Sequence, residues 1–106
     1  MKIAIGMCGK TSGKCSSMGC FRAYNNKDKH FTVYKDIETE LMAFFSCNLC
    51  FENGEEKLNN IANRLKKNRV DKLHLGACAL KCKEDRLKEI KKVFIDLGID
   101  VVEGTH

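Results

Sequence analysis

The sequence predicts a small α/β protein built on a parallel sheet. Short apolar runs alternate with segments of helical periodicity, and each connection between the apolar runs is long enough to hold a helix. Right-handed crossovers of this kind favour a four-stranded sheet in the order 2-1-3-4, a truncated flavodoxin-like arrangement with flanking helices. A chain of 106 residues is expected to form a single domain over residues 1–106.

The first half of the chain contains two predicted strands and one predicted helix. Lys2–Met7 is a short β-branched run that predicts the first strand, and a loop of glycine and small polar residues follows it. Met18–Asn26 predicts a short helix. Phe31–Tyr34 has extended character and predicts an additional short extended segment, and Glu40–Ser46 predicts the second strand.

The second half repeats the alternation of helix and strand. Glu55–Asn68 has apolar residues at helical spacing, with acidic residues in its first turn and lysines in its last, as the helix dipole favours. Lys72–Ala77 predicts the third strand. Glu84–Leu97 is a second amphipathic helix that Gly98 is expected to end, and Ile99–Val102 predicts the fourth strand.

Composition and charge exclude several classes of protein. The formal charge of +5 is mild, and thiolates bound to a cation would reduce it, so charge does not indicate a nucleic-acid partner. No apolar run approaches a membrane span, and the N-terminal one is too short for a signal-peptide core. We therefore expect a cytoplasmic protein with no membrane partner. Clustered cysteines in a reducing compartment indicate metal binding or redox chemistry rather than structural disulfides.

The seven cysteines fall in three clusters, and each cluster directly follows a predicted strand. The carboxyl ends of parallel strands meet at one edge of a sheet, where ligands bind. Neighbouring strands lie roughly 5 Å apart, so the ends of strands 2, 1 and 3 would span roughly 10 Å. The clusters are Cys8, Cys15 and Cys20; Cys47 and Cys50; and Cys78 and Cys82. The sequence therefore predicts a single thiol-rich site at this edge.

Spacing distinguishes the cysteines from one another. Cys47 and Cys50 form a C-x-x-C pair, which chelates one metal from a tight turn and is also the layout of a redox dithiol. Cys78 and Cys82 are one helical turn apart, so they could be ligands or two small buried residues. Cys8 ends the predicted central strand and is expected to be a ligand.

The other candidates are less constrained by the pattern. Cys15 and Cys20 lie further along the first loop, so they could complete the site, form a second one or serve as reserve thiols. His106 follows the fourth strand and becomes a candidate ligand at the same edge. His74 lies inside the third strand, and we interpret it as a core histidine held by a hydrogen bond. His30 lies in a polar segment and is expected to be solvated.

Taken in order, these motifs resemble the CGGC-domain family of small cysteine-rich proteins over nearly the full length of the chain. The matching motifs are the strand leading to Cys8, Cys15 to Cys20-Phe21, the central C-x-x-C, His74-Leu75-x-x-Cys78, and the closing Val102-Glu103-Gly104-Thr105-His106. The resemblance implies a metal-binding domain and no established reaction. Where the family has Gly-Gly between the central cysteines, this chain has Asn48-Leu49, which keeps the spacing of the thiols but adds bulk between them.

The leading hypothesis is a metal-binding protein. Its expected ligands are Cys8, Cys47, Cys50 and Cys78, with Cys15, Cys20, Cys82 and His106 as further candidates. The metal could be zinc, which takes four Cys or His ligands, or iron in an iron–sulfur cluster, which prefers an all-Cys shell. Mixed Cys and His content narrowly favours zinc. The alternatives are a thiol–disulfide redox protein that uses Cys47 and Cys50, and an interaction or storage module whose cysteines serve as metal-trafficking ligands. Either could act with a protein partner, through redox or metal transfer.

Overall fold

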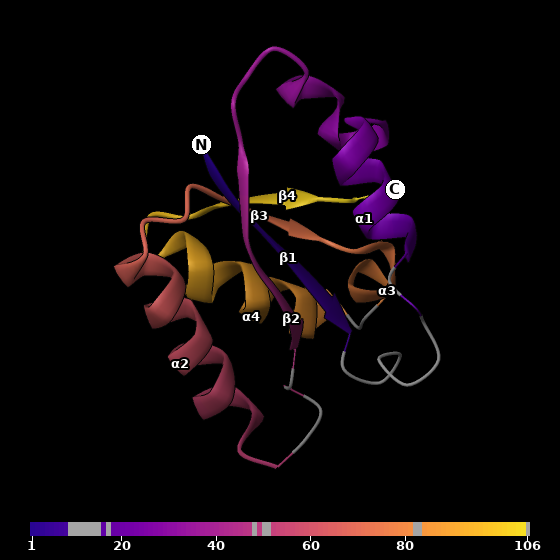
Figure 1. The fold of residues 1–106 in the computed structure, drawn as a ribbon. Coiled ribbons are helices and arrows are strands. Elements are labelled where there is room, and N and C mark those ends of the chain that lie inside the picture. Colours follow the sequence, from indigo (N-terminus) through magenta and orange to yellow (C-terminus); the bar gives the residue numbers. More distant parts are fainter. Residues whose placement is uncertain (9–15, 17, 48, 50–51, 82–83, 106) are drawn as a thin grey trace.

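The computed structural model describes residues 1–8, 16, 18–47, 49, 52–81 and 84–105. Within them the chain forms a four-stranded parallel sheet with helices packed on both faces (Figure 1). The strand order is β2-β1-β3-β4, which confirms the predicted fold class and order. Across the part of the chain that the structure describes, no helix combines the length and the apolar composition needed to cross a bilayer.

The strands are β1 (Lys2–Cys8), β2 (Glu40–Cys47), β3 (Lys72–Leu75) and β4 (Asp100–Glu103). β1 pairs with both β2 and β3, and residues 3–7 of this strand are buried because helices cover both of its faces. This explains the continuous apolar run of the first strand, since a central parallel strand has no face turned to water.

The helices divide between the two faces of the sheet. α1 (Met18–Asn26) and the 3₁₀ helix η2 (Lys29–Tyr34) pack on one face around buried aromatic residues. α2 (Gly54–Lys67), α3 (Ala77–Leu80) and α4 (Glu84–Ile95) contribute to the apolar cluster on the other. Figure 1 shows α1 lying near the carboxyl ends of the strands, on the side of the sheet away from α2 and α4.

The prediction of an extended segment at Phe31–Tyr34 is wrong, because these residues belong to the 3₁₀ helix η2. A strand would place Phe31 and Tyr34 on opposite faces. In a 3₁₀ helix, residues three apart share a face, and both aromatic rings are buried against the sheet while Thr32 and Val33 are exposed. Burial of two aromatic rings thus outweighs the β propensity of the segment.

The predicted third strand also ends earlier than expected. β3 stops at Leu75, because the Gly76 carbonyl accepts hydrogen bonds from the N–H groups of Ala79 (2.9 Å) and Leu80 (3.2 Å) and so begins the short helix α3. Cys78 therefore lies in the first turn of a helix. The remaining predicted elements differ from the observed ones by no more than two residues at an end.

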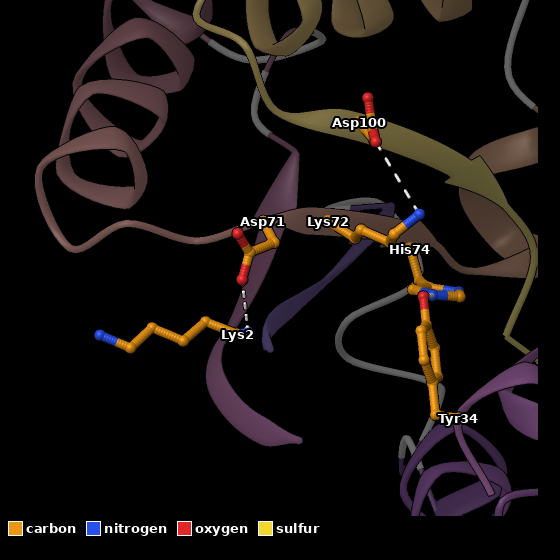
Figure 2. Close-up of polar contacts among 6 residues, drawn as sticks. All are labelled: Lys2, Tyr34, Asp71, Lys72, His74 and Asp100. Atoms are coloured by element: carbon orange, nitrogen blue, oxygen red, sulfur yellow. Dashed lines mark hydrogen bonds and ion pairs between the residues drawn. The ribbon is translucent and has the colours of Figure 1, made fainter. Parts of the chain in front are cut away.

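Polar contacts join the starts of the strands at the amino edge of the sheet (Figure 2). The Lys2 N–H donates to the Asp71 carboxylate at 2.8 Å, and the Lys72 ammonium lies 3.8 Å from the Asp100 carboxylate. Both contacts involve exposed or half-buried groups, and such pairs stabilise a protein only slightly. Cys8, Cys47 and Cys78 lie at the opposite, carboxyl edge.

Candidate functional site

Two of the predicted ligands end neighbouring strands. Cys8 is the last residue of β1 and Cys47 is the last residue of β2, and the two are partners in the parallel register. Both are half-buried. The pairing holds their backbones side by side at the carboxyl edge, as the sequence predicts from the positions of the strand ends.

Cys78 joins them from α3. Its Sγ accepts a hydrogen bond from the Cys8 N–H at 3.3 Å, which links the end of β1 to the first turn of the helix. The contact fixes the direction of the Cys78 sulfur relative to the end of the central strand.

Cys20 reaches the same region from α1, on the opposite face of the sheet from α2 and α4. Its side chain is buried, and its Sγ lies 3.3 Å from the Thr105 Oγ1. A methyl group placed on Gly76 would lie 3.5 Å from the Cys78 Sγ and 3.9 Å from the Cys20 Sγ. The two sulfurs therefore border the same space beside Gly76. We call Cys8, Cys20, Cys47 and Cys78 the thiol edge.

Sequence reasoning left the direction of Cys20 open, although a signal was present. Cys20, Ala23 and Tyr24 are the buried residues of α1, at positions i, i+3 and i+4. This spacing marks one face of a helix. A helix that packs that face on the sheet has to point Cys20 inward, so the apolar face of α1 could have indicated the position of Cys20.

His74 is fully buried and uses both ring nitrogens. Its Nδ1 lies 2.9 Å from the Gly104 carbonyl oxygen, which can only accept, so Nδ1 carries the proton and donates. Its Nε2 then accepts from the Tyr34 hydroxyl at 2.7 Å. Figure 2 shows Tyr34 reaching from η2 to the ring on β3. Burial, and to a lesser extent the Asp100 charge, raise the pKa of Tyr34, which keeps its hydroxyl a donor.

The environment also keeps His74 neutral. Burial lowers the pKa of the His74 imidazole, the Gly104 carbonyl opposes that shift, and positive charge on His30 and Lys72 adds to it. A neutral ring with both nitrogens engaged fits the predicted core histidine and leaves neither nitrogen for a metal.

We predict that stability falls in mild acid because of His74. Its pKa is lower in the folded than in the unfolded chain, so stability is complete above about pH 6.5 and is lost as the pH falls toward the folded pKa. The slope should approach about 1.4 kcal/mol per pH unit. Guanidinium unfolding between pH 7.5 and 5 measures it. His74→Phe should lose the slope, whereas His30→Gln should keep most of it, because burial is the largest cause of the lowered pKa of His74. Equal slopes in wild type and His74→Phe would refute the assignment.

The closing segment requires glycine at position 104. Gly104 has φ +125°, a conformation that side chains rarely adopt, and the His30 ring occupies the position that a methyl group there would take. Its N–H donates to the Leu75 carbonyl at 2.9 Å. Thr105 follows and is fully buried. The Glu103-Gly104-Thr105 sequence therefore closes the fold against β3 beside the thiol edge.

The remaining predicted ligands, Cys15, Cys50, Cys82 and His106, lie outside the described residues. Among the described ones, no three His, Cys, Asp or Glu side chains stand close enough together to hold a metal ion. The donor type fits, because the sulfurs that gather here are ligands that zinc and iron–sulfur clusters favour. The described part of the site therefore supplies fitting donors in an incomplete set.

Comparison with known proteins shows the family and the fold. The chain is 33% identical to an uncharacterized protein of Methanocaldococcus jannaschii, an alignment that covers all of this chain and 87% of that protein. A solved structure, the solution structure of a phosphate-loop protein, superposes with a TM-score of 0.52 at 15% identity and covers all of this chain and 80% of that one. At this identity the likeness concerns the fold. The model of the CGGC domain, whose Cys and His content suggests metal binding in general, matches residues 2–106. The chain belongs to the CGGC-domain family.

Proposed function

We propose that the protein binds a thiophilic metal at the thiol edge, with zinc narrowly preferred over an iron–sulfur cluster. One observation carries the proposal. The Cys78 Sγ accepts the Cys8 N–H and borders, together with the Cys20 Sγ, the same space beside Gly76. Two sulfurs from separate helices, α1 and α3, thus lie beside one space at the sheet edge, and the backbone at the end of β1 contacts one of them.

The proposed ligands come from all three cysteine clusters. They are drawn from Cys8, Cys47, Cys50 and Cys78, to which we add Cys20, with Cys15, Cys82 and His106 as further candidates. A zinc ion would take four of these. A bound zinc ion would supply a tetrahedral link between these segments. A metal that binds the folded chain and not the unfolded chain stabilises the fold, so metal should raise the unfolding temperature. We place this activity in the cytoplasm, where thiols stay reduced, with transfer of metal to a protein partner as its expected use.

A thiol–disulfide activity is the second candidate. Cys47 ends β2, and α2 begins at Gly54, so the C-x-x-C pair connects a strand to a helix as in dithiol oxidoreductases. In this reaction one thiolate attacks a substrate disulfide, which forms a mixed disulfide and releases one substrate thiolate. The second thiolate then attacks the mixed disulfide and releases the other substrate thiolate, while Cys47 and Cys50 become joined by a disulfide. Two electrons pass from the protein to its substrate.

Metal analysis and absorption spectroscopy of protein purified without oxygen test the proposal. We expect a colourless protein with stoichiometric zinc. A brown protein with broad visible absorption, iron and acid-labile sulfide would replace zinc by a cluster and keep the thiol edge as its site. A folded protein that contains no metal and takes up neither zinc nor iron would refute metal binding. Reversible oxidation of Cys47 and Cys50 in that protein would then support the dithiol reaction.

A further inference from the structure

We propose that His74 is a positioning residue for Cys20, acting through Gly104 and Thr105. The inference rests on the proposed function, because Cys20 is one of the proposed ligands. The contacts form a continuous path from a buried imidazole to a sulfur: His74 Nδ1 to the Gly104 carbonyl at 2.9 Å, then along the backbone to Thr105, whose Oγ1 lies 3.3 Å from the Cys20 Sγ.

The imidazole is a rigid starting point. It is fully buried, its ring centroid lies 4.4 Å from that of Phe31, and the Tyr34 hydroxyl holds its Nε2 at 2.7 Å. A buried ring held at both nitrogens cannot rotate without leaving polar atoms unpaired, which costs more than the bonds themselves contribute. The direction of its Nδ1–H is therefore fixed relative to β3.

Gly104 is held by β3 at both of its backbone polar groups. Its carbonyl accepts from the His74 side chain, and its N–H donates to the carbonyl of the next β3 residue, Leu75, at 2.9 Å. Two hydrogen bonds to successive residues of one strand fix the peptide planes on either side of Gly104. Thr105 follows directly, so this arrangement sets where the Thr105 side chain points.

Thr105 then orients the sulfur. Its side chain is fully buried and Cys20 is 5% exposed, so the contact between the two is shielded from water. The contact holds the sulfur against Thr105 and fixes its direction, as outer-shell partners do for metal ligands. His74 thus acts on Cys20 without touching a metal, and releasing Gly104 should expose and misdirect the Cys20 thiol.

Alkylation of the reduced, metal-free full chain by iodoacetamide, read at Cys20 by peptide mass spectrometry, tests the path. We expect His74→Phe, which removes the donor to Gly104, to raise the Cys20 rate about tenfold. His74→Asn should stay near the wild-type rate, because its amide can replace the Nδ1–H. Tyr34→Phe removes only the bond to Nε2 and is the matched control. It should lower stability yet leave the Cys20 rate within about twofold.

Two variants at the other end of the path keep the test decisive if His74→Phe does not fold. Thr105→Val should raise the Cys20 rate, and Thr105→Ser, which keeps the hydroxyl, should not. The proposal is overturned if Tyr34→Phe and His74→Phe change the Cys20 alkylation rate in the same proportion to their loss of stability. It is also overturned if Thr105→Val leaves the Cys20 rate unchanged. The alkylation experiment contains no metal, so its outcome does not depend on whether the protein binds metal. Zinc titration of the wild type measures metal binding independently.

Discussion

Replacing Cys78 by serine is expected to weaken metal binding by at least about 100-fold while the chain stays folded. The serine hydroxyl is close in size to the thiol and can still accept the Cys8 N–H that the Cys78 Sγ accepts at 3.3 Å. It is a poor ligand for zinc, which is bound in proteins by thiolate, imidazole and carboxylate. Competition against a chelator measures the affinity, and circular dichroism measures the fold.

The matched variants for this prediction are Cys50→Ser and His30→Gln. Cys50→Ser should lose metal as strongly as Cys78→Ser, because both are proposed ligands of one ion. His30→Gln removes an exposed imidazole beside Gly104 and should keep full metal binding. If Cys78→Ser keeps wild-type affinity while Cys50→Ser loses it, the cysteine clusters do not share a site and the account of the sheet edge is wrong.

Much of the fold could be predicted from the sequence because local and long-range preferences agree. The apolar run of β1 and the amphipathic pattern of α2 each predict the observed element, and short right-handed crossovers leave few strand orders. The register that pairs Cys8 with Cys47 follows from two strands that end at the same edge.

The failures have a common physical cause. Phe31–Tyr34 reads as extended because its residues favour strands, but its aromatic rings gain more by sharing one buried face of η2. β3 ends at Leu75 because hydrogen bonds to the Gly76 carbonyl begin α3. Both outcomes depend on what packs against the segment, which a local pattern does not contain.

The candidate site was only partly predictable for the same reason. The strand ends indicate where Cys8 and Cys47 lie, whereas Cys20 lies here because the buried face of α1 packs on the sheet. The role of His74 depends on Gly104, thirty residues later in the chain, and on Tyr34 in a helix predicted as extended. Contacts of such long sequence separation leave no periodic pattern in a single sequence.

The substitution Gly76→Ala is expected to weaken metal binding without loss of stability. Gly76 has φ −63° and ψ 158°, which alanine adopts readily. Its methyl group would lie 3.5 Å from the Cys78 Sγ and 3.9 Å from the Cys20 Sγ, at ordinary contact distance. The folded chain can therefore accept it, and alanine in place of glycine in a compatible conformation stabilises by about 0.4–1 kcal/mol. The methyl group would fill the space in which both sulfurs must approach one ion.

Gly98→Ala is the matched control, because it should have the opposite effects. Gly98 follows α4 with φ +81°, and a methyl group there would lie near the Lys66 Nζ rather than near a cysteine. Alanine is strained in this conformation, so stability should fall by about 1 kcal/mol while metal binding is retained. The two variants thus separate an effect on the site from an effect on the fold.

The most direct test of the thiol edge is the zinc affinity of Gly76→Ala measured beside its unfolding free energy without metal. We predict that the zinc affinity falls at least about tenfold, the size of effect seen when a residue that supports a metal ligand is replaced. The metal-free protein should be as stable as the wild type or slightly more stable. Wild-type zinc affinity in a stably folded Gly76→Ala protein would contradict the account, because Cys20 and Cys78 could not then hold one ion across the space beside Gly76.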